Sequence, residues 1–496
     1  MNSIKKIIFN ILFAIIFVTS IYCQEEQENT LRWFRGGKVD IDFSLQTDLF
    51  CGIGGKFSNS CASLNKDVSS IYWNPAQLAF IPYRQVELDF IPSFNLNVGN
   101  FYDISAEVQA SVDNAIADYQ ASETTVEYTE VDPGYNHVGG LNNVSISIPA
   151  SKMWAHIAIA FSYSRAMDIQ LNLLGNGLSS LLDIEKNVGD QTMIVKFRND
   201  LDINFKLRLQ INRMSFALAK KWAPTFSTGI TINRYYGNIS VNGKFNIDGI
   251  MEIAGNEYAF NDPYDPHIDF ENGEQNDLNQ SIYTQFNGKG MGFKVGNFFQ
   301  PNKNFAIGAV LEIIPPMNFN GDMKVEQNMM PALNANALTG EADEDEEIID
   351  PAKLDLAKLT LTTPYENPID DKCEVNFPSS FTLGMAYKLG FLKGNINFTN
   401  YFKQFSFSTL GVTRGAKFNY GIRSAFDFKL FQISLGVTAI DEIRKGTDND
   451  EEAAKNILLP QFSLGFGYSI NKHLRSEALL FLVPTPVGKW TFLFAF

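Results

Sequence analysis

The chain has 496 residues and a formal net charge of -15. This charge argues against nucleic-acid binding, because phosphate contacts need clusters of Lys and Arg. The sequence has only four His and four Cys, and it contains no zinc-type spacing such as CxxC or HExxH. It also lacks the GxGxxG, GxxxxGK[ST] and GxSxG motifs of nucleotide-binding proteins and hydrolases. We therefore expect a protein that is not an enzyme and that uses no cofactor and no metal.

Residues 1–23 are predicted to form a secretory signal peptide. Lys5 and Lys6 precede a short apolar run at residues 7–18, and charged residues follow from residue 24. An uncleaved N-terminal anchor is the alternative reading. After this segment no apolar run reaches the ~18 residues that a membrane-spanning helix needs.

Period-two alternation dominates the rest of the chain. In the segment 157–163, Ile157, Ile159, Phe161 and Tyr163 alternate with small or polar residues. Aromatic residues make up 13% of the chain. Alternation of large apolar with small or polar residues is typical of transmembrane strands. A soluble sandwich would also alternate, but Val, Ile and Leu would dominate its core. Fourteen strands are predicted, at 84–98, 140–150, 153–164, 203–221, 226–240, 284–299, 305–315, 379–389, 392–400, 416–428, 430–440, 459–470, 473–483 and 489–496.

Most connections between these strands alternate between short and long. Outer-membrane barrels show this pattern, with short periplasmic turns and long external loops. We therefore predict that residues 83–496 form an antiparallel transmembrane β-barrel of about 14 strands in the bacterial outer membrane. A count of 12–16 stays open, and a helix is expected within the external segment 101–131. Acidic loops such as residues 341–350 are either solvated surface or a calcium site.

The chain ends in the alternating segment KWTFLFAF. Phe492, Phe494 and Phe496 lie on one face of the predicted last strand. This ending resembles the C-terminal signal by which the barrel-assembly machinery recognises outer-membrane barrels. We therefore expect that machinery and outer-membrane lipid to be partners of the protein.

Residues 24–82 are predicted to form an N-terminal extension and a hatch inside the lumen. Cys51 and Cys61 precede the first predicted strand, and they either form a disulfide or remain two separate small apolar residues. The segment 53–79, IGGKFSNSCASLNKDVSSIYWNPAQLA, resembles the N-terminal hatch of the outer-membrane long-chain fatty-acid transporter family, the FadL-like proteins. The matching residues are Gly52, Gly54, Gly55, Asp67, Tyr72, Trp73, Asn74, Pro75, Ala76 and Leu78. Gln77 departs from the pattern, because the family usually has Gly there.

This resemblance implies passive uptake of long-chain fatty acids or other hydrophobic compounds through a plugged barrel. The partner would then be a hydrophobic small molecule or a lipid, and the hatch motif would be Tyr72, Trp73, Asn74, Pro75 and Ala76. The alternative is a PorV-like outer-membrane interaction or shuttle protein for secreted proteins. An enzyme would need a catalytic constellation, but His156 and Ser162 lie roughly 20 Å apart along one predicted strand. A soluble periplasmic β-protein is the remaining alternative.

Overall fold

The computed structural model describes residues 30–35, 38–47, 60–92, 130–135, 139–150, 156–188, 191–253, 256–259, 278–327, 367–409, 412–428, 430–445, 457–471, 473–483 and 487–496. The predicted signal peptide and the acidic segment 341–350 lie outside these residues, as does the segment 93–129 that holds most of the predicted helix. Within the described residues, no helix is both long enough and apolar enough to cross a membrane.

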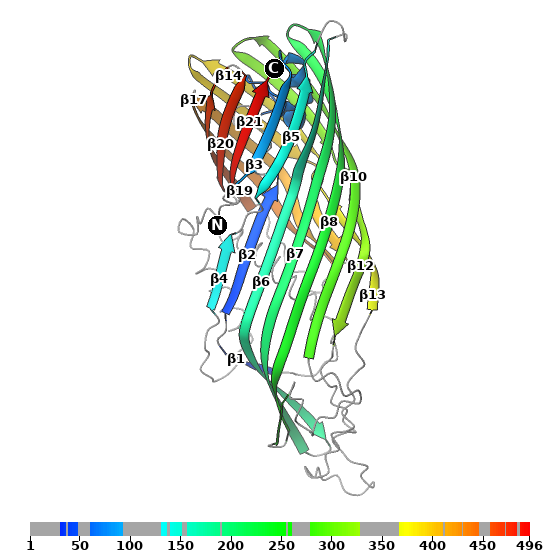
Figure 1. Cartoon of the computed structure of the whole chain (residues 1–496). Helices are drawn as coiled ribbons and strands as arrows, with labels where there is room; N and C mark the ends of the chain where they lie inside the picture. The colour runs from blue at the N-terminus through cyan, green and yellow to red at the C-terminus, as the bar shows by residue number, and fades with distance from the viewer. Residues whose placement is uncertain are drawn as a thin grey trace.

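Fourteen antiparallel strands form a closed ring (Figure 1). The ring closes where the last strand pairs with the first, for example at Phe492 opposite Leu88. The predicted barrel of about 14 strands is therefore confirmed. Around the ring, the strands are β3 (Gln85–Ile91), β5 (Gly140–Ile148), β6 (Ile157–Val188), β7 (Gln191–Ala223), β8 (Phe226–Ile253), β10 (Leu278–Asn302), β11 (Phe305–Ile313), β14 (Ser380–Leu389), β15 (Leu392–Tyr401), β17 (Val412–Phe428), β18 (Phe431–Lys445), β19 (Ile457–Ser469), β20 (Leu474–Val483) and β21 (Val487–Ala495).

Seven further strands extend the wall at one end of the ring. The first group, β12 (Met317–Gln327), β13 (Asn367–Asn376) and β16 (Phe405–Thr409), continues the wall between β10 and β17. The second group consists of β1 (Thr30–Arg35), β2 (Lys38–Thr47), β4 (Glu130–Tyr135) and β9 (Asn256–Ala259). Of these, β1 and β2 pair with β6, β4 lies parallel to β2, and β9 pairs with β8.

The two ends of the barrel differ in their connections. At the end where β3 begins and β21 finishes, most neighbouring strands are joined by two to four residues, such as 224–225, 303–304 and 390–391. We call this the short-turn end, and it carries the C-terminus in Figure 1. Short turns face the periplasm in outer-membrane barrels, so the opposite end, the far end, faces the exterior.

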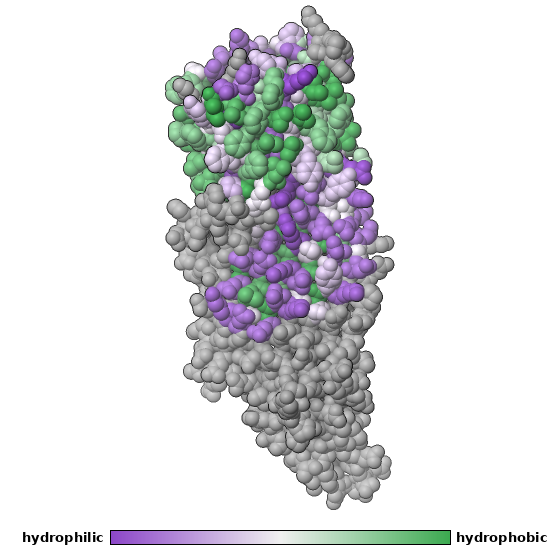
Figure 2. Space-filling view, in the orientation of Figure 1, coloured by the Kyte–Doolittle hydropathy of each residue, from purple (hydrophilic) through white to green (hydrophobic). Residues whose placement is uncertain are grey.

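An apolar belt lies near the short-turn end on the face of the barrel that Figure 2 shows, and exposed apolar side chains on other strands, such as Leu383 and Phe466, continue it. One row across four strands illustrates it: Phe161, Phe216, Ile232 and Phe293 lie opposite one another and are all exposed. The next residues along these strands, such as Ser162 and Ser215, face inward and are buried. Apolar outward and polar inward is the pattern that a lipid environment stabilises.

The polarity of the wall reverses beyond this belt. On β7, the outward-facing Asp202, Asn204 and Lys206 are exposed, whereas Ile203 and Phe205 face inward and are buried. Residues 191–212 of β7 lie beyond the belt and span roughly 70 Å, at about 3.3 Å per residue. The predicted strands 153–164 and 203–221 leave the segment 165–202 between them, and the count of 12–16 stays open because this segment could hold extra strands. In the structure, most of this segment instead continues β6 and β7, and only residues 189–190 lie between the two strands.

The N-terminal extension is also partly a wall element. Strand β2 pairs with β6 from Lys38 opposite Asn176 to Thr47 opposite Met167, beyond the point where β5 begins (Figure 1). Its direction is antiparallel to β6, so the chain runs from the far end towards the membrane. Within the predicted hatch region 24–82, residues 60–81 lie in the lumen, whereas residues 38–47 belong to the wall.

Candidate functional site: a plug in the barrel lumen

The residues 60–81, which we call the plug, fold as two short helical turns. The first is α3 (Ser70–Trp73), and Asp67 precedes it and accepts hydrogen bonds from the backbone N–H and the hydroxyl of Ser69. The second is the 3₁₀ helix η1 (Pro75–Phe80), in which Pro75 occupies the first position, where its missing N–H costs nothing. The residue between them, Asn74, has extended backbone angles and ends one turn while beginning the other.

The Asn74 side chain uses all its polar groups inside the barrel. Its Oδ1 accepts a hydrogen bond from Ala76 N at 3.0 Å, which caps η1. Its Nδ2 donates to the carbonyl oxygen of Cys61 at 2.7 Å and to that of Asn297 at 2.9 Å. The residue is fully buried. Asn74 therefore joins two parts of the plug to each other and to strand β10.

Four glycines on neighbouring strands receive the plug, and we call them the glycine socket. They are Gly229, Gly296, Gly308 and Gly384, from β8, β10, β11 and β14. They form two cross-strand pairs, Gly229 with Gly296 and Gly308 with Gly384. A Cβ atom at Gly229 would lie 2.5 Å from Ala76 N, and one at Gly296 would overlap Asn74 Oδ1. Only glycine lets the backbone of the plug come this close to the wall.

Tyr72 fixes the other side of the plug to β5 and β6. Its hydroxyl donates to Asn143 Oδ1 at 2.9 Å and makes a short hydrogen bond with Ser162 Oγ. The guanidinium carbon of Arg213 lies 4.4 Å from the ring centroid. Burial raises the pKa of the Tyr72 phenol, and the positive charge of Arg213 partly offsets this. The phenol is therefore neutral at ordinary pH and acts as a hydrogen-bonding group.

Replacing Tyr72 with Phe should destabilise the folded protein by about 1–3 kcal/mol, because the amide of Asn143 and the hydroxyl of Ser162 lose a buried partner. Thermal denaturation in detergent would measure the loss. Tyr163→Phe provides a matched control, since Tyr163 lies on β6 next to Ser162 but is exposed on the outer face. Equal melting temperatures for the two variants would contradict the role assigned to the Tyr72 hydroxyl.

A buried charge network holds the start of the plug. Asp67 Oδ2 lies 2.6 Å from an Arg475 guanidinium nitrogen, and Arg475 Nε lies 2.6 Å from Glu477 Oε1. On the adjacent strands, Thr491 donates to Asp89 Oδ1 at 2.7 Å and Asn143 donates to Glu87 Oε1 at 3.2 Å. The plug is thus connected to β20 through Arg475, which lies between two carboxylates.

The remaining predicted site residues fall in different surroundings. Trp73 is half-buried, with Arg423 5.7 Å from its ring, and Ala76 is fully buried against Gly229. Cys61 has a free, buried thiol whose pKa is raised to about 12 by desolvation, and Cys51 lies outside the described residues.

The predicted assembly signal lies on β21 and at the chain end. Phe492 and Phe494 are half-buried, Phe496 is 70% exposed, and Phe496 N donates to the carbonyl of Arg84.

Several functional residues were not predicted from the sequence. The glycine socket is formed by strands that are up to 155 residues apart (Gly229 to Gly384), so no local motif marks it. Ser60 was also missed, although its hydroxyl donates to Asn397 Oδ1 at 2.9 Å and so fixes the plug to β15. The inward-facing glycines within alternating strands were a usable signal, because Gly in a strand often marks close approach of another backbone.

An apolar cluster lines the lumen on the far side of the plug. Its buried members come from β6, β7, β8, β10, β12, β13 and the segments beside them. The members are Ala166, Met167, Leu209, Ile211, Tyr235, Ile239, Phe286, Ile314, Met317, Phe319, Cys373, Val375 and Phe377. Between this cluster and the plug, Lys294 donates to the carbonyl of Tyr72 and pairs with Glu312 at 3.2 Å. The lumen beyond the plug is therefore filled by packed apolar side chains, and cationic groups lie between them and the plug.

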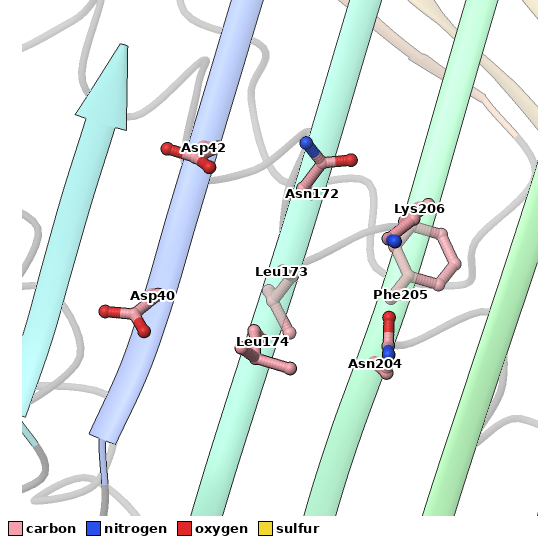
Figure 3. A pocket seen from close by; sticks show the side chains of 8 residues that line it. All are labelled: Asp40, Asp42, Asn172, Leu173, Leu174, Asn204, Phe205 and Lys206. Carbon is pink, nitrogen blue, oxygen red and sulfur yellow. The ribbon is translucent and has the colours of Figure 1, made fainter. Parts of the chain in front are cut away.

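A separate pocket of about 500 Å³ lies beyond the belt, midway along the wall between β2, β6 and β7 (Figure 3). Its lining combines Asp40 and Asp42 of β2 with residues of the two neighbouring strands. Most of these lining side chains are polar, which does not suit an apolar ligand. No group of three or more metal-binding side chains is found among the residues that the structure describes.

The closed ring, the outward apolar belt and the internal plug define the protein as a plugged β-barrel of the outer membrane. No protein-family model and no curated protein matches the chain. Solved structures are similar in fold. One is a FadL homologue from Pseudomonas aeruginosa, with 10% identity and a TM-score of 0.43, covering 94% of this chain and 98% of that one.

Two further similar structures are toluene transporters. TbuX from Ralstonia pickettii has 10% identity and a TM-score of 0.40, covering 90% of this chain and 95% of the other. TodX from Pseudomonas putida has 10% identity and a TM-score of 0.36, covering 88% and 94%. At this level of identity, the likeness concerns the fold.

Proposed function

We propose that the protein takes up hydrophobic compounds passively across the outer membrane. The observation that carries this proposal is the reversal of polarity along the wall. In the belt, apolar side chains face outward to lipid; beyond it, apolar side chains such as Leu209 and Phe286 face inward. Insertion into the membrane requires apolar residues on the outside of the belt. It does not require an apolar interior in the part of the barrel beyond the belt.

The physical sequence of uptake follows from this lining. A hydrophobic solute gains about 25 cal/mol for each Å² of apolar surface that leaves water, so the lined extension captures it. The plug then stops the solute at Tyr72 and Trp73 and prevents the lumen from acting as an open water channel. Passage requires the plug to shift locally, and no chemical step is needed.

Among hydrophobic compounds, we propose long-chain fatty acids as the substrates. Arg213 and Arg423 lie over the rings of Tyr72 and Trp73, and Lys294 donates to the backbone carbonyl of Tyr72; Lys294 and Arg213 are buried. A carboxylate at the end of an alkyl chain would find positive charge there, while its chain stays on the apolar cluster. Oleate and toluene are therefore the informative pair of probes, since toluene has no charged group.

Leu209→Asp should reduce uptake by about tenfold or more, because an unpaired carboxylate in an apolar lining costs several kcal/mol and repels a hydrophobic solute. Uptake of radiolabelled oleate and toluene by cells that express the variant would measure this. Gln210→Asp is the matched control, since Gln210 is the next residue on β7 and points to the outer face.

Two results would contradict the proposal. One is equal uptake by cells that carry Leu209→Asp and cells that carry Gln210→Asp, at equal protein levels in the outer membrane. The other is normal uptake in a deletion strain that mislocalises secreted proteins. The latter result would support the shuttle function instead.

A further inference from the structure

Three lysines gather where the plug meets the short-turn end of the barrel. Lys66 belongs to the plug, Lys221 lies near the end of β7, and Lys393 lies near the start of β15. All three are half-buried. They face the short-turn end, on the opposite side of the plug from the apolar cluster.

The hydrogen bonds and ring contacts of these lysines are to neutral groups, whereas Lys393 also lies opposite Asp427 on the neighbouring strand β17 and feels its negative charge. Lys66 Nζ donates to Gln300 Oε1 at 2.6 Å, and Lys393 Nζ donates to Asn65 Oδ1 at 2.6 Å. Lys221 Nζ lies 4.4 Å from the centroid of the Phe80 ring. No carboxylate of the described residues lies within the 4.0 Å of a salt bridge to any of the three.

The electrostatic consequence is visible at Lys66. Burial, together with the positive charges of Lys221 and Lys393, lowers its pKa to about 8. The three ammonium groups therefore repel one another in a partly desolvated place. A bound anion would remove this unfavourable free energy.

Apolar side chains stand beside the same cations. The rings of Phe80 and Phe298 meet edge to face with centroids 5.3 Å apart, and Lys66 Nζ lies 5.3 Å from the first and 5.2 Å from the second. Ala76, Ala306 and Leu64 pack around these rings, and of the two rings Phe80 is the one that is partly exposed. Positive charge bordered by aromatic rings suits a ligand that carries an anionic head on a hydrocarbon chain.

We propose that Lys66, Lys221 and Lys393 form a binding site for the carboxylate of an amphipathic compound, with its chain against Phe80. The site rests on the proposed function only in one respect: a compound that leaves the lumen at the short-turn end would pass it. Its place is separate from Arg213, Lys294 and Arg423, which contact the other side of the plug. The site would hold the carboxylate after the plug and so oppose its return.

The test uses the full-length mature protein in nanodiscs, with lysines ¹³C-dimethylated and Lys66 assigned by its missing NMR signal in Lys66→Arg. We expect the Lys66 signal to titrate near pH 8 and saturating decanoate to raise its pKa by one unit or more. Decanol, with the same chain and no charge, should leave the titration unchanged. Because Lys66 loses its proton above about pH 8, decanoate should bind at least severalfold more weakly at pH 9.5 than at pH 7.

Lys66→Gln should lower decanoate affinity about tenfold, whereas Lys303→Gln, on the exposed turn after β10, should leave it unchanged. Equal effects of decanoate and decanol on the wild-type titration would overturn the site, even if the Gln variant failed to fold. The proposed uptake function is tested separately. If cells showed no oleate uptake while decanoate still shifted the Lys66 pKa, the uptake function would be contradicted and the lysine site would stand.

Discussion

Gly296→Ala should unseat the plug and raise the ion conductance of the barrel. The added Cβ would overlap Asn74 Oδ1 and lie 3.1 Å from Pro75 Cδ, and the backbone of a closed barrel cannot retreat far. Overpacking of this kind typically costs about 1–3 kcal/mol. Here it would destabilise the plug in its seated position and leave the rest of the barrel unaffected. Conductance in planar bilayers, and the sensitivity of cells to a large antibiotic such as vancomycin, would report the change.

Gly421→Ala is the matched control. Gly421 also faces the lumen, but an added Cβ would first meet Thr438 Oγ1 at 3.2 Å, outside the glycine socket. The double variant Gly296→Ala/Asn74→Ala removes the overlapping amide, so its conductance should fall back towards that of Asn74→Ala alone. A Gly296→Ala barrel as tight to ions as the wild type would rule out the socket. If neither glycine variant assembled, the added methyl groups would be disrupting the inner wall of the barrel itself and not the seating of the plug.

Arg475→Met should cause the largest loss of thermal stability among single substitutions in the lumen. Arg475 lies between Asp67 and Glu477 at 2.6 Å from each, and both carboxylates are fully buried. Removing one partner of a buried ion pair costs about 3–5 kcal/mol, because a charge is left uncompensated. The temperature at which the folded band is lost on a heat-modifiability gel would measure the effect.

Asp67→Asn should cost less than Arg475→Met, since Arg475 would keep Glu477 as its partner. Arg234→Met is the control for losing an arginine side chain, because Arg234 is exposed on the outer face of β8 with its guanidinium 5.2 Å from the Tyr236 ring. Its effect should stay within about 0.5 kcal/mol, as for most surface substitutions. If Asp67→Asn proved the more destabilising change, Arg475 would not be the centre of the network.

The barrel and its number of strands could be predicted because lipid imposes a simple rule on the chain. Each strand in the belt must place apolar residues outward, and Phe161, Leu383 and Phe466 all follow this rule. The Asn-Pro turn could be located for a similar reason, since Pro75 and Asn74 have few backbone alternatives. Local chemistry was sufficient for both features.

The far end could not be predicted by the same rule, because its polarity is inverted. A search for large residues facing outward passes over Leu171, Leu173 and Phe205, which alternate just as regularly but face inward. The three lysines at the short-turn end and the four glycines of the socket were hidden for another reason. Each set comes from elements far apart in the chain, and only the register of the closed ring brings its members together.

Strand β2 has a consequence for how the barrel is assembled. The plug is preceded by a strand that is hydrogen-bonded to β6, and it is followed within a few residues by β3, the first strand of the ring. Its two ends are therefore anchored, and it can shift but cannot leave the barrel as a free unit. The ring closes by contacts such as Thr491 with Asp89, which are 402 residues apart. Contacts so distant in sequence form slowly, so the seam between β21 and β3 would be the last to close, around a plug that is already inside.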